Sequence, residues 1–258
     1  MITLIPMAGA GSRFAEKGYT TPKPLLPVLG KPMVILANEM LPGKGKPIFV
    51  VRTEHIAQFG IDASLKKELP NCEIVTVTGL TEGQASTCLL AKNFINNDEE
   101  LIIGASDNGM ILDNEAFEKE KQTCDALVFS FRNNPTVLAN PKAYGWAVVN
   151  ENNFITEMKV KYNMPEPLKN HAVVGAFWFK KGKYFVEAAE RMIAQNRRIN
   201  NEFYVDEVAT DLIQLGYKVK VFEIQNYICW GTPSDYETFN YWENFFDAMS
   251  FHSYKKKY

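Results

Sequence analysis

A short segment near the N-terminus combines residue types that are suited to holding a polyphosphate. Residues 8–12 read Ala-Gly-Ala-Gly-Ser, and because Gly9 and Gly11 carry no side chain, backbone N–H groups can approach an anion closely. Arg13 follows with a forked, permanently charged guanidinium that matches phosphate oxygens. Ten residues later, Lys23 stands between two prolines, which should hold its backbone extended and stiff. Together these residues predict a site that holds a polyphosphate.

Two better-known phosphate-binding loops do not fit these glycines. A P-loop closes with Gly-Lys-Ser/Thr, whereas Gly11 is followed by Ser12 and Arg13. A dinucleotide-binding fingerprint needs a third glycine and an acidic residue about 20 positions on. Phe14 stands where that glycine should be, and Glu39 comes too late. A plain turn with a solvated arginine is the simplest alternative, but it leaves the nearby Pro-Lys-Pro-Leu motif unexplained.

Both motifs resemble those of the sugar nucleotidyltransferases. The matching segments are residues 7–14, Met-Ala-Gly-Ala-Gly-Ser-Arg-Phe, and residues 22–25, Pro-Lys-Pro-Leu, and weaker matches continue to about residue 240. Enzymes of this family join an NTP to a phosphomonoester and release pyrophosphate, for the biosynthesis of sugar nucleotides and of polysaccharides such as capsules. The resemblance implies an α/β fold with a Rossmann-like mixed sheet of the nucleotide-diphospho-sugar transferase type and an inserted β-rich acceptor-binding region.

Strand-like and helical patterns alternate in the first half of the chain, which predicts a parallel sheet with right-handed crossovers. The expected strands there are residues 2–7, 47–52, 73–77 and 100–105, and the expected helices are 61–69, 84–94 and 113–122. In such sheets, ligands bind at the carboxyl ends of the strands. The glycine loop and the Ser106-Asp107-Asn108 sequence both follow strands of this kind.

The second half is richer in β-strand patterns. Its expected strands are residues 126–132, 144–149, 154–160, 173–179 and 218–224, with helices at 184–195, 205–215 and 233–249. No repeat or linker divides the chain, so a single domain is expected over residues 1–258. Within it we expect a nucleotide-binding half at 1–132, an acceptor-binding half at 133–232 and a C-terminal helix and tail at 233–258.

Bulk composition excludes several other classes of protein. The net charge of −2 argues against general nucleic-acid binding, and no apolar run approaches the ~18 residues of a membrane span. The four cysteines are scattered and only three histidines occur, so a zinc site is not expected. Reduced core thiols and an N-terminal strand in place of a signal peptide predict a cytoplasmic protein.

Asp107 is the expected metal ligand. It ends the apolar run 101–107, where a carboxylate needs water, an ion partner or a metal. Mg²⁺ binds one or two carboxylates together with substrate phosphates, and the resemblance implies a metal-binding aspartate at this strand end. A turn cap is the alternative reading of Asp107. The family's second carboxylate should precede Gly231, but Cys229 stands there, so Asn226, Asp235 or a water remain open as the second ligand.

The resemblance also implies the acceptor side of the site. Lys161 ends a strand that resembles the one whose lysine meets the acceptor phosphate, although Val160 replaces the usual glutamate and argues against an ordinary hexose. A solvated lysine at a strand edge is the alternative. The other residues expected to contact the acceptor are Tyr144, Gly145, Gly175 and Glu202. A capped helix start explains the segment around Glu202 nearly as well.

The nucleobase is expected beside the loop at residues 79–86. There the resemblance places Gly83 close to the base, and Gln84 can both donate and accept hydrogen bonds. The short Thr-Glu-Gly-Gln sequence resembles pyrimidine-using members, so CTP or UTP is predicted, whereas an ordinary helix start is the alternative reading. The full set expected to contact the nucleotide is Ala8, Gly9, Gly11, Ser12, Gly83, Gln84 and Ser106.

The chemistry requires no side-chain base, because a phosphomonoester is mostly dianionic at pH 7 and is already a nucleophile. Catalysis then consists mostly of positioning and electrostatics. We expect Arg13 to hold the β- and γ-phosphates, Lys23 to bridge the α-phosphate and the attacking group, and Lys161 to steer the acceptor. Mg²⁺ on Asp107 would offset the charge of the pyrophosphate. A metal-dependent glycosyltransferase and a non-enzymatic nucleotide-binding domain are the rival hypotheses.

The C-terminal region is rich in aromatic residues. Phe239, Trp242 and Phe246 recur at helical spacing, with Tyr241 and Phe245 on either side. Packing of this helix against the chain's own sheet is the simplest explanation. The aromatic surface nevertheless exceeds what one closing helix needs, and exposed aromatic stripes often mark association surfaces. The sequence therefore predicts that this helix helps to form a homodimer.

Overall fold

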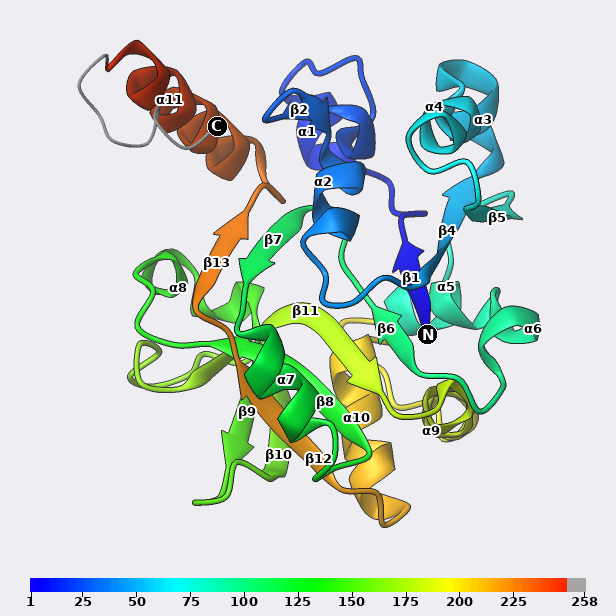
Figure 1. Ribbon diagram of the computed structural model, residues 1–258, viewed down its shortest axis with the longest axis vertical. Coiled ribbons are helices and arrows are strands. Elements are labelled where there is room, and N and C mark those ends of the chain that lie inside the picture. Colours follow the sequence, from blue (N-terminus) through cyan, green and yellow to red (C-terminus); the bar gives the residue numbers. More distant parts are fainter. Residues whose placement is uncertain (250–258) are drawn as a thin grey trace.

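The computed structural model describes residues 1–249 and shows a mixed α/β fold built on a nine-stranded sheet (Figure 1). Four parallel strands form one side of it, in the order β6 (Leu101–Ile103), β1 (Ile2–Pro6), β4 (Lys46–Arg52) and β5 (Glu73–Val77). Helices connect them, as the alternating pattern predicts. The order means that the loops after these strands line up along one edge of the sheet.

The other side of the sheet is mixed, as the expected fold requires. β11 (His171–Phe179) runs antiparallel to β6 and joins the two sides. β11 also pairs with β8 (Ala126–Phe131) and β9 (Gly145–Val149), in both cases antiparallel. β10 (Ile155–Val160) pairs antiparallel with β9, and β12 (Val219–Glu223) pairs parallel with β8. The sheet is therefore parallel throughout from β6 to β5, whereas on the other side β8 and β12 run parallel and the other pairs named here run antiparallel.

Helices cover both faces of this sheet. Alternate strand residues face opposite sides, so Leu4 and Ile103 belong to one buried cluster and Ile5 and Ile102 to the other. The first cluster includes residues of α5 (Gln84–Leu89), α9 (Gly182–Ala194) and α10 (Val205–Gln214). The second includes residues of α2 (Met33–Glu39), α4 (Ile61–Glu68) and α7 (Asn114–Glu120).

The remaining elements are short, and the sequence patterns did not indicate most of them. They are α1 (Ser12–Glu16), η1 (Lys23–Leu25), β2 (Pro27–Val28), β3 (Lys31–Pro32), α3 (Thr53–Phe59), α6 (Lys92–Ile95), β7 (Asn108–Ile111), α8 (Thr136–Ala139), η2 (Pro141–Ala143) and β13 (Asn226–Cys229). The helix expected over 84–94 is divided into α5 and α6. Between them, backbone N–H groups bond three residues back, as in the bond from Ala91 to Cys88, which tightens the turn.

The C-terminal helix α11 (Pro233–Ala248) extends from the body of the molecule instead of packing on the large sheet, so that expectation is wrong (Figure 1). Tyr236 and Phe239 anchor its first half in a third cluster with Phe14 and Trp230. The Tyr236 hydroxyl also donates to the Pro27 carbonyl over 2.9 Å. Residues 250–258 of the expected tail lie outside the described residues. Within the part of the chain that the structure describes, no helix is long and apolar enough to cross a membrane.

Candidate active site

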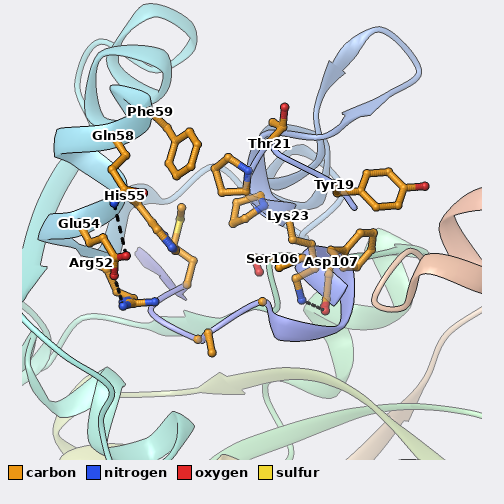
Figure 2. A pocket seen from close by; sticks show the side chains of 18 of the residues that line it. Tyr19, Thr21, Lys23, Arg52, Glu54, His55, Gln58, Phe59, Ser106 and Asp107 are labelled. Carbon is orange, nitrogen blue, oxygen red and sulfur yellow. Dashed lines mark hydrogen bonds and ion pairs between the residues drawn. The ribbon is translucent and has the colours of Figure 1, made fainter. Parts of the chain in front are cut away.

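Two cavities meet at the carboxyl ends of the parallel strands. The first, of about 390 Å³, lies between the glycine loop, the residues around Lys23 and helix α3 (Figure 2). The second, of about 280 Å³, lies under the end of β10 and the start of α10. Three residues line both cavities: Gln84, Ala105 and Asp107. Two adjoining sites on one aspartate suit a reaction in which two substrates meet.

An ion pair stands at this junction. Lys23 Nζ lies 2.6 Å from Asp107 Oδ2, and the side chains are only 17% and 24% exposed. Burial works against ionisation of Asp107, but the charge and hydrogen bond of Lys23, aided by the charge of Arg13, hold its pKa below the ordinary value. Asp107 is therefore ionised at neutral pH. Lys23 begins a short 3-10 turn after the extended Pro22, so its backbone is not extended as expected.

The glycine loop lies directly beside this pair. Gly9 and Gly11 line the first cavity, and Gly11 takes a φ of 63°, which favours glycine, just before α1. Ser106 lines the same cavity at the end of the neighbouring strand. Arg13, on α1, lines the second cavity and not the first, so it does not lie in the cavity of the glycine loop as expected for a ligand of the β- and γ-phosphates.

Lys161 reaches the second cavity, together with Tyr144, Gly145 and Gly175. Its ammonium donates to the Ala143 carbonyl over 3.0 Å and lies 5.4 Å above the centre of the Tyr204 ring. These four residues, which the resemblance implied for the acceptor side, therefore line the same cavity. Tyr204, Asp206 and Tyr227 also line it. They lie in two segments that the resemblance had indicated, residues 201–207 and 226–233, although none of the three was predicted as a contact.

Four other predicted contacts lie outside both cavity linings. Ala8 is buried and Ser12 is exposed at the start of α1. Gly83 packs against the backbone of Phe203, which shapes the loop without facing either cavity. Glu202 is exposed and accepts a hydrogen bond from the Tyr204 hydroxyl, whereas its neighbours Tyr204 and Asp206 line the second cavity.

Asp206 lies close to Gly145 in the second cavity. A Cβ at Gly145 would lie 2.2 Å from Asp206 Oδ1, so any larger residue at this position of β9 would push the Asp206 carboxyl aside. Burial raises the pKa of Asp206 to about 6, although the positive charge of Lys161 acts in the opposite direction. This carboxyl therefore changes charge close to neutral pH.

We expect the Asp206→Asn variant to gain stability relative to the wild type as pH rises from 4 to 7. The folded protein binds the Asp206 proton more tightly than the unfolded chain does. Its contribution is therefore complete below pH 4 and is lost as pH rises to about 6. The difference amounts to at most about 3 kcal/mol, because solvent reaches part of the side chain. Urea unfolding of both proteins at several pH values measures it, and a pH-independent difference would contradict the assignment.

The donor set at the junction fits a magnesium ion only with help from the substrate. Asp107 is the carboxylate available there, and Mg²⁺ commonly binds one or two carboxylates plus phosphate oxygens. Burial, followed by the charge of Asp107, raises the pKa of Cys229 to about 12, so this thiol is protonated at neutral pH. Asp235 accepts a 2.6 Å hydrogen bond from Thr232. Among residues 1–249, no group of three or more His, Cys, Asp or Glu side chains could hold a metal by itself.

Comparison with known proteins gives relatives of one kind. The bifunctional protein GlmU of Thermotoga maritima is 25% identical over 226 residues, which are 86% of this chain and 46% of that protein. The bifunctional sugar-1-phosphate nucleotidylyltransferase/acetyltransferase of Sulfurisphaera tokodaii is 25% identical over 231 residues, 88% of this chain and 51% of that protein. The chain thus spans about half the length of the curated relatives that it matches.

Solved structures share the fold over nearly the whole chain. The nucleoside-diphosphate-sugar pyrophosphorylase from Vibrio cholerae RC9 has a TM-score of 0.74 at 21% identity, over 92% of this chain and 99% of that one. The inositol-1-phosphate CTP transferase from T. maritima has a TM-score of 0.70 at 14% identity, over 96% and 97%. This likeness confirms the expected fold class. A family model described as nucleotidyl transferase matches residues 2–244, and the chain therefore belongs to that family.

Proposed function

We propose that this protein transfers a nucleotidyl group from an NTP to a phosphorylated small molecule and releases pyrophosphate. The observation that carries the proposal is the meeting of two cavities at the Lys23–Asp107 pair. The glycine loop lines one cavity, and Lys161 lines the other. The NTP would occupy the first, so that its α-phosphate lies at the shared wall, within reach of an acceptor phosphate in the second.

The charged side chains suit this reaction. The attacking phosphate and the triphosphate repel each other, and three cations, Arg13, Lys23 and Lys161, line the two cavities around the junction. Lys23 would stabilise charge on the transferring phosphoryl group, while Lys161 and Arg13 would hold the acceptor phosphate in line. Bound between Asp107 and the substrate phosphates, Mg²⁺ would neutralise charge on the NTP.

The finer assignments are part of the same proposal. The acceptor is a sugar phosphate or a related phosphomonoester, and the nucleotide is a pyrimidine NTP, CTP or UTP. The product would be an activated sugar or alcohol that a polysaccharide- or capsule-building transferase consumes in the cytoplasm. The name of the Sulfurisphaera tokodaii relative, a sugar-1-phosphate nucleotidylyltransferase/acetyltransferase, supports a sugar 1-phosphate as the acceptor class.

A pyrophosphate-release grid tests the function. Four NTPs are combined with a panel of sugar 1-phosphates and other phosphomonoesters, with Mg²⁺ or with excess EDTA. Pyrophosphate should appear only when an NTP, an acceptor and Mg²⁺ are all present. No pyrophosphate with any pair would overturn the proposed function, and full activity in EDTA would overturn the role of the metal.

We also propose that the outer half of α11 joins two copies of the chain. Tyr241, Trp242 and Phe245 are exposed there, and Trp242 contacts the rings of Phe245 and Phe246. An exposed group of aromatic rings is typical of an association surface. Analytical ultracentrifugation at micromolar concentration should give the mass of a dimer, and Trp242→Glu should shift it toward the monomer. A monomeric mass for the wild type would contradict the proposal.

A further inference from the structure

The end of the first cavity opposite Asp107 contains polar groups that the proposed transfer chemistry does not use. Arg52, at the end of β4, and Glu54 and His55, on α3, line this end together with Gln58 and Phe59 (Figure 2). Neither the glycine loop nor the acceptor residues belong to this group. This group is therefore expected to contact a part of the nucleotide other than its phosphates.

Sheet topology places these residues between two parts of the nucleotide site. Val50 of β4 pairs with Pro6, just before the glycine loop, while Arg52 pairs with Val77, just before the loop that contains Gly83. Along the sheet edge the order is therefore Asp107, glycine loop, Arg52, Gly83 loop. If the α-phosphate lies beside Asp107, the sugar and base extend toward β4 and β5. The base then reaches the end of β4.

His55 and Arg52 each have a buried polar atom without a hydrogen-bond partner among the described residues. Its side chain is only 8% exposed, and Nδ1 is buried without a hydrogen-bond partner among the described residues. The Nε atom of Arg52 is buried and unpartnered in the same way, although the guanidinium forms an ion pair with Glu54 through its Nη2 atom. Buried polar atoms are nearly always hydrogen-bonded in folded proteins. Both residues line the cavity, so a molecule that binds there and shifts the two side chains slightly would complete both atoms.

The chemistry of the group favours a neutral, flat ligand over another phosphate. The carboxylate of Glu54 beside Arg52 cancels the positive charge that a phosphate would need. Burial, and then the charge of Arg52, lowers the pKa of His55, so its ring is neutral at pH 7. Phe59, whose ring lies 6.2 Å from that of His55, adds an apolar surface. Donors, acceptors and an aromatic ring together suit a nucleobase.

The Arg52 guanidinium can present two hydrogen-bond donors to a ligand, and the Glu54 carboxylate beside it presents an acceptor. Cytosine presents the complementary order, with O2 and N3 as acceptors and the N4 amino group as donor. Uracil presents an O4 acceptor where cytosine has that amino group. Its O4 and the Glu54 carboxylate would then face each other as two acceptors, with no hydrogen between them. Carboxylates are established partners of the cytosine N4 group.

We propose that Arg52, Glu54 and His55 form the subsite that reads the nucleobase, and that this base is cytosine. The inference rests on the proposed nucleotidyl transfer and deepens it. Glu54 accepts from the N4 amino group, Arg52 donates to O2 and N3, and His55 bonds another polar atom of the nucleoside. Gln84 then lies at the shared wall, nearer to the phosphates than to the base.

Glu54→Gln is the most direct test. The amide keeps the shape of Glu54 but supplies an NH₂ group that can donate to the O4 of uracil. The kcat/KM for pyrophosphate release is measured with CTP and with UTP. The wild type should prefer CTP, and the variant should lower the CTP-to-UTP ratio by about 10-fold or more. Glu68→Gln, the same charge change on the exposed end of α4, should keep the wild-type ratio.

Calorimetric titration with CTP and UTP provides a readout that does not need the reaction. Preferred CTP binding that Glu54→Gln weakens supports the subsite. A preference for UTP or a purine, or an unchanged ratio in a folded variant, overturns the inference, while pyrophosphate release would still support the proposed function. Conversely, if no acceptor gives pyrophosphate, the function fails, and the titrations still decide the base.

Discussion

Replacing Lys23 with alanine is expected to lower kcat by roughly 10²–10³-fold, the usual cost of removing one group that stabilises transition-state charge. Lys23 Nζ lies 2.6 Å from Asp107 at the wall that both cavities share, so it is the cation nearest to the expected point of transfer. Steady-state pyrophosphate release with the best substrate pair measures the effect. Near-wild-type kcat in a folded Lys23→Ala protein would exclude the assigned role.

Two further variants separate this role from simple loss of an ion pair. Lys31 also pairs with a carboxylate, Glu39, but both side chains are more than 40% exposed, and Lys31→Ala should change neither kcat nor stability noticeably. Lys23→Arg keeps a positive charge beside Asp107 but presents it with a different shape and reach. If Lys23 served only to neutralise Asp107, Lys23→Arg would keep the wild-type kcat. We expect a kcat well below that of the wild type, because the cation must also reach the transferring phosphoryl group.

Gly83→Ala is expected to destabilise the protein by roughly 2–5 kcal/mol, the sum of backbone strain and overpacking. Gly83 has a φ of 124°, and an added Cβ would lie 2.5 Å from the Phe203 nitrogen and 2.6 Å from its carbonyl oxygen. These are backbone atoms, and they cannot move aside as a flexible side chain could. The Phe203 N–H donates to Glu82, and the Phe203 carbonyl accepts from Ala85, so the two segments are fastened on both sides of Gly83.

Urea unfolding of Gly83→Ala beside Gly79→Ala gives a matched comparison. Gly79 lies in the same loop, but a Cβ added there would have no neighbouring atom within 4 Å. The free energy of unfolding of Gly79→Ala should therefore stay within about 0.5 kcal/mol of the wild type. The same loss in both variants would mean that the loop tolerates no side chain anywhere. No loss in Gly83→Ala would mean that Phe203 does not pack against this glycine in solution.

Local sequence patterns were sufficient to find the centre of the candidate site. The glycine loop and Asp107 each follow a buried strand, and such positions converge because parallel strands end at one edge. Lys23 was predicted from its Pro-Lys-Pro-Leu motif and lies beside Asp107 in the structure. Lys161 was also found, since it ends a recognisable strand. The mixed sheet was expected from the resemblance, whereas the periodicity of the first half alone suggested a parallel arrangement that stops at β6.

Some cavity residues were not predicted, because their position depends on tertiary contacts and no local sequence pattern marks them. Arg52, Glu54 and His55 look like the ordinary start of a helix, and nothing in their spacing indicates a ligand. They reach the cavity because two crossovers insert β4 between β1 and β5. The first turn of α5 likewise depends on a residue distant in sequence, because the Phe203 carbonyl accepts a hydrogen bond from the Ala85 N–H.

The order of amino acids alone establishes which chemical groups are present and, through strand ends and glycines, which of them gather at one edge of a sheet. Which groups share a cavity depends instead on the folded chain. In the folded chain, Arg13 lines the second cavity, and Tyr204 and Asp206 line it where Glu202 was expected. His55 lines the first cavity, and its Nδ1 atom has no hydrogen-bond partner among the described residues. This division arises because strand ends follow from short-range patterns, whereas a cavity is bounded by side chains from segments whose proximity depends on the whole sheet order.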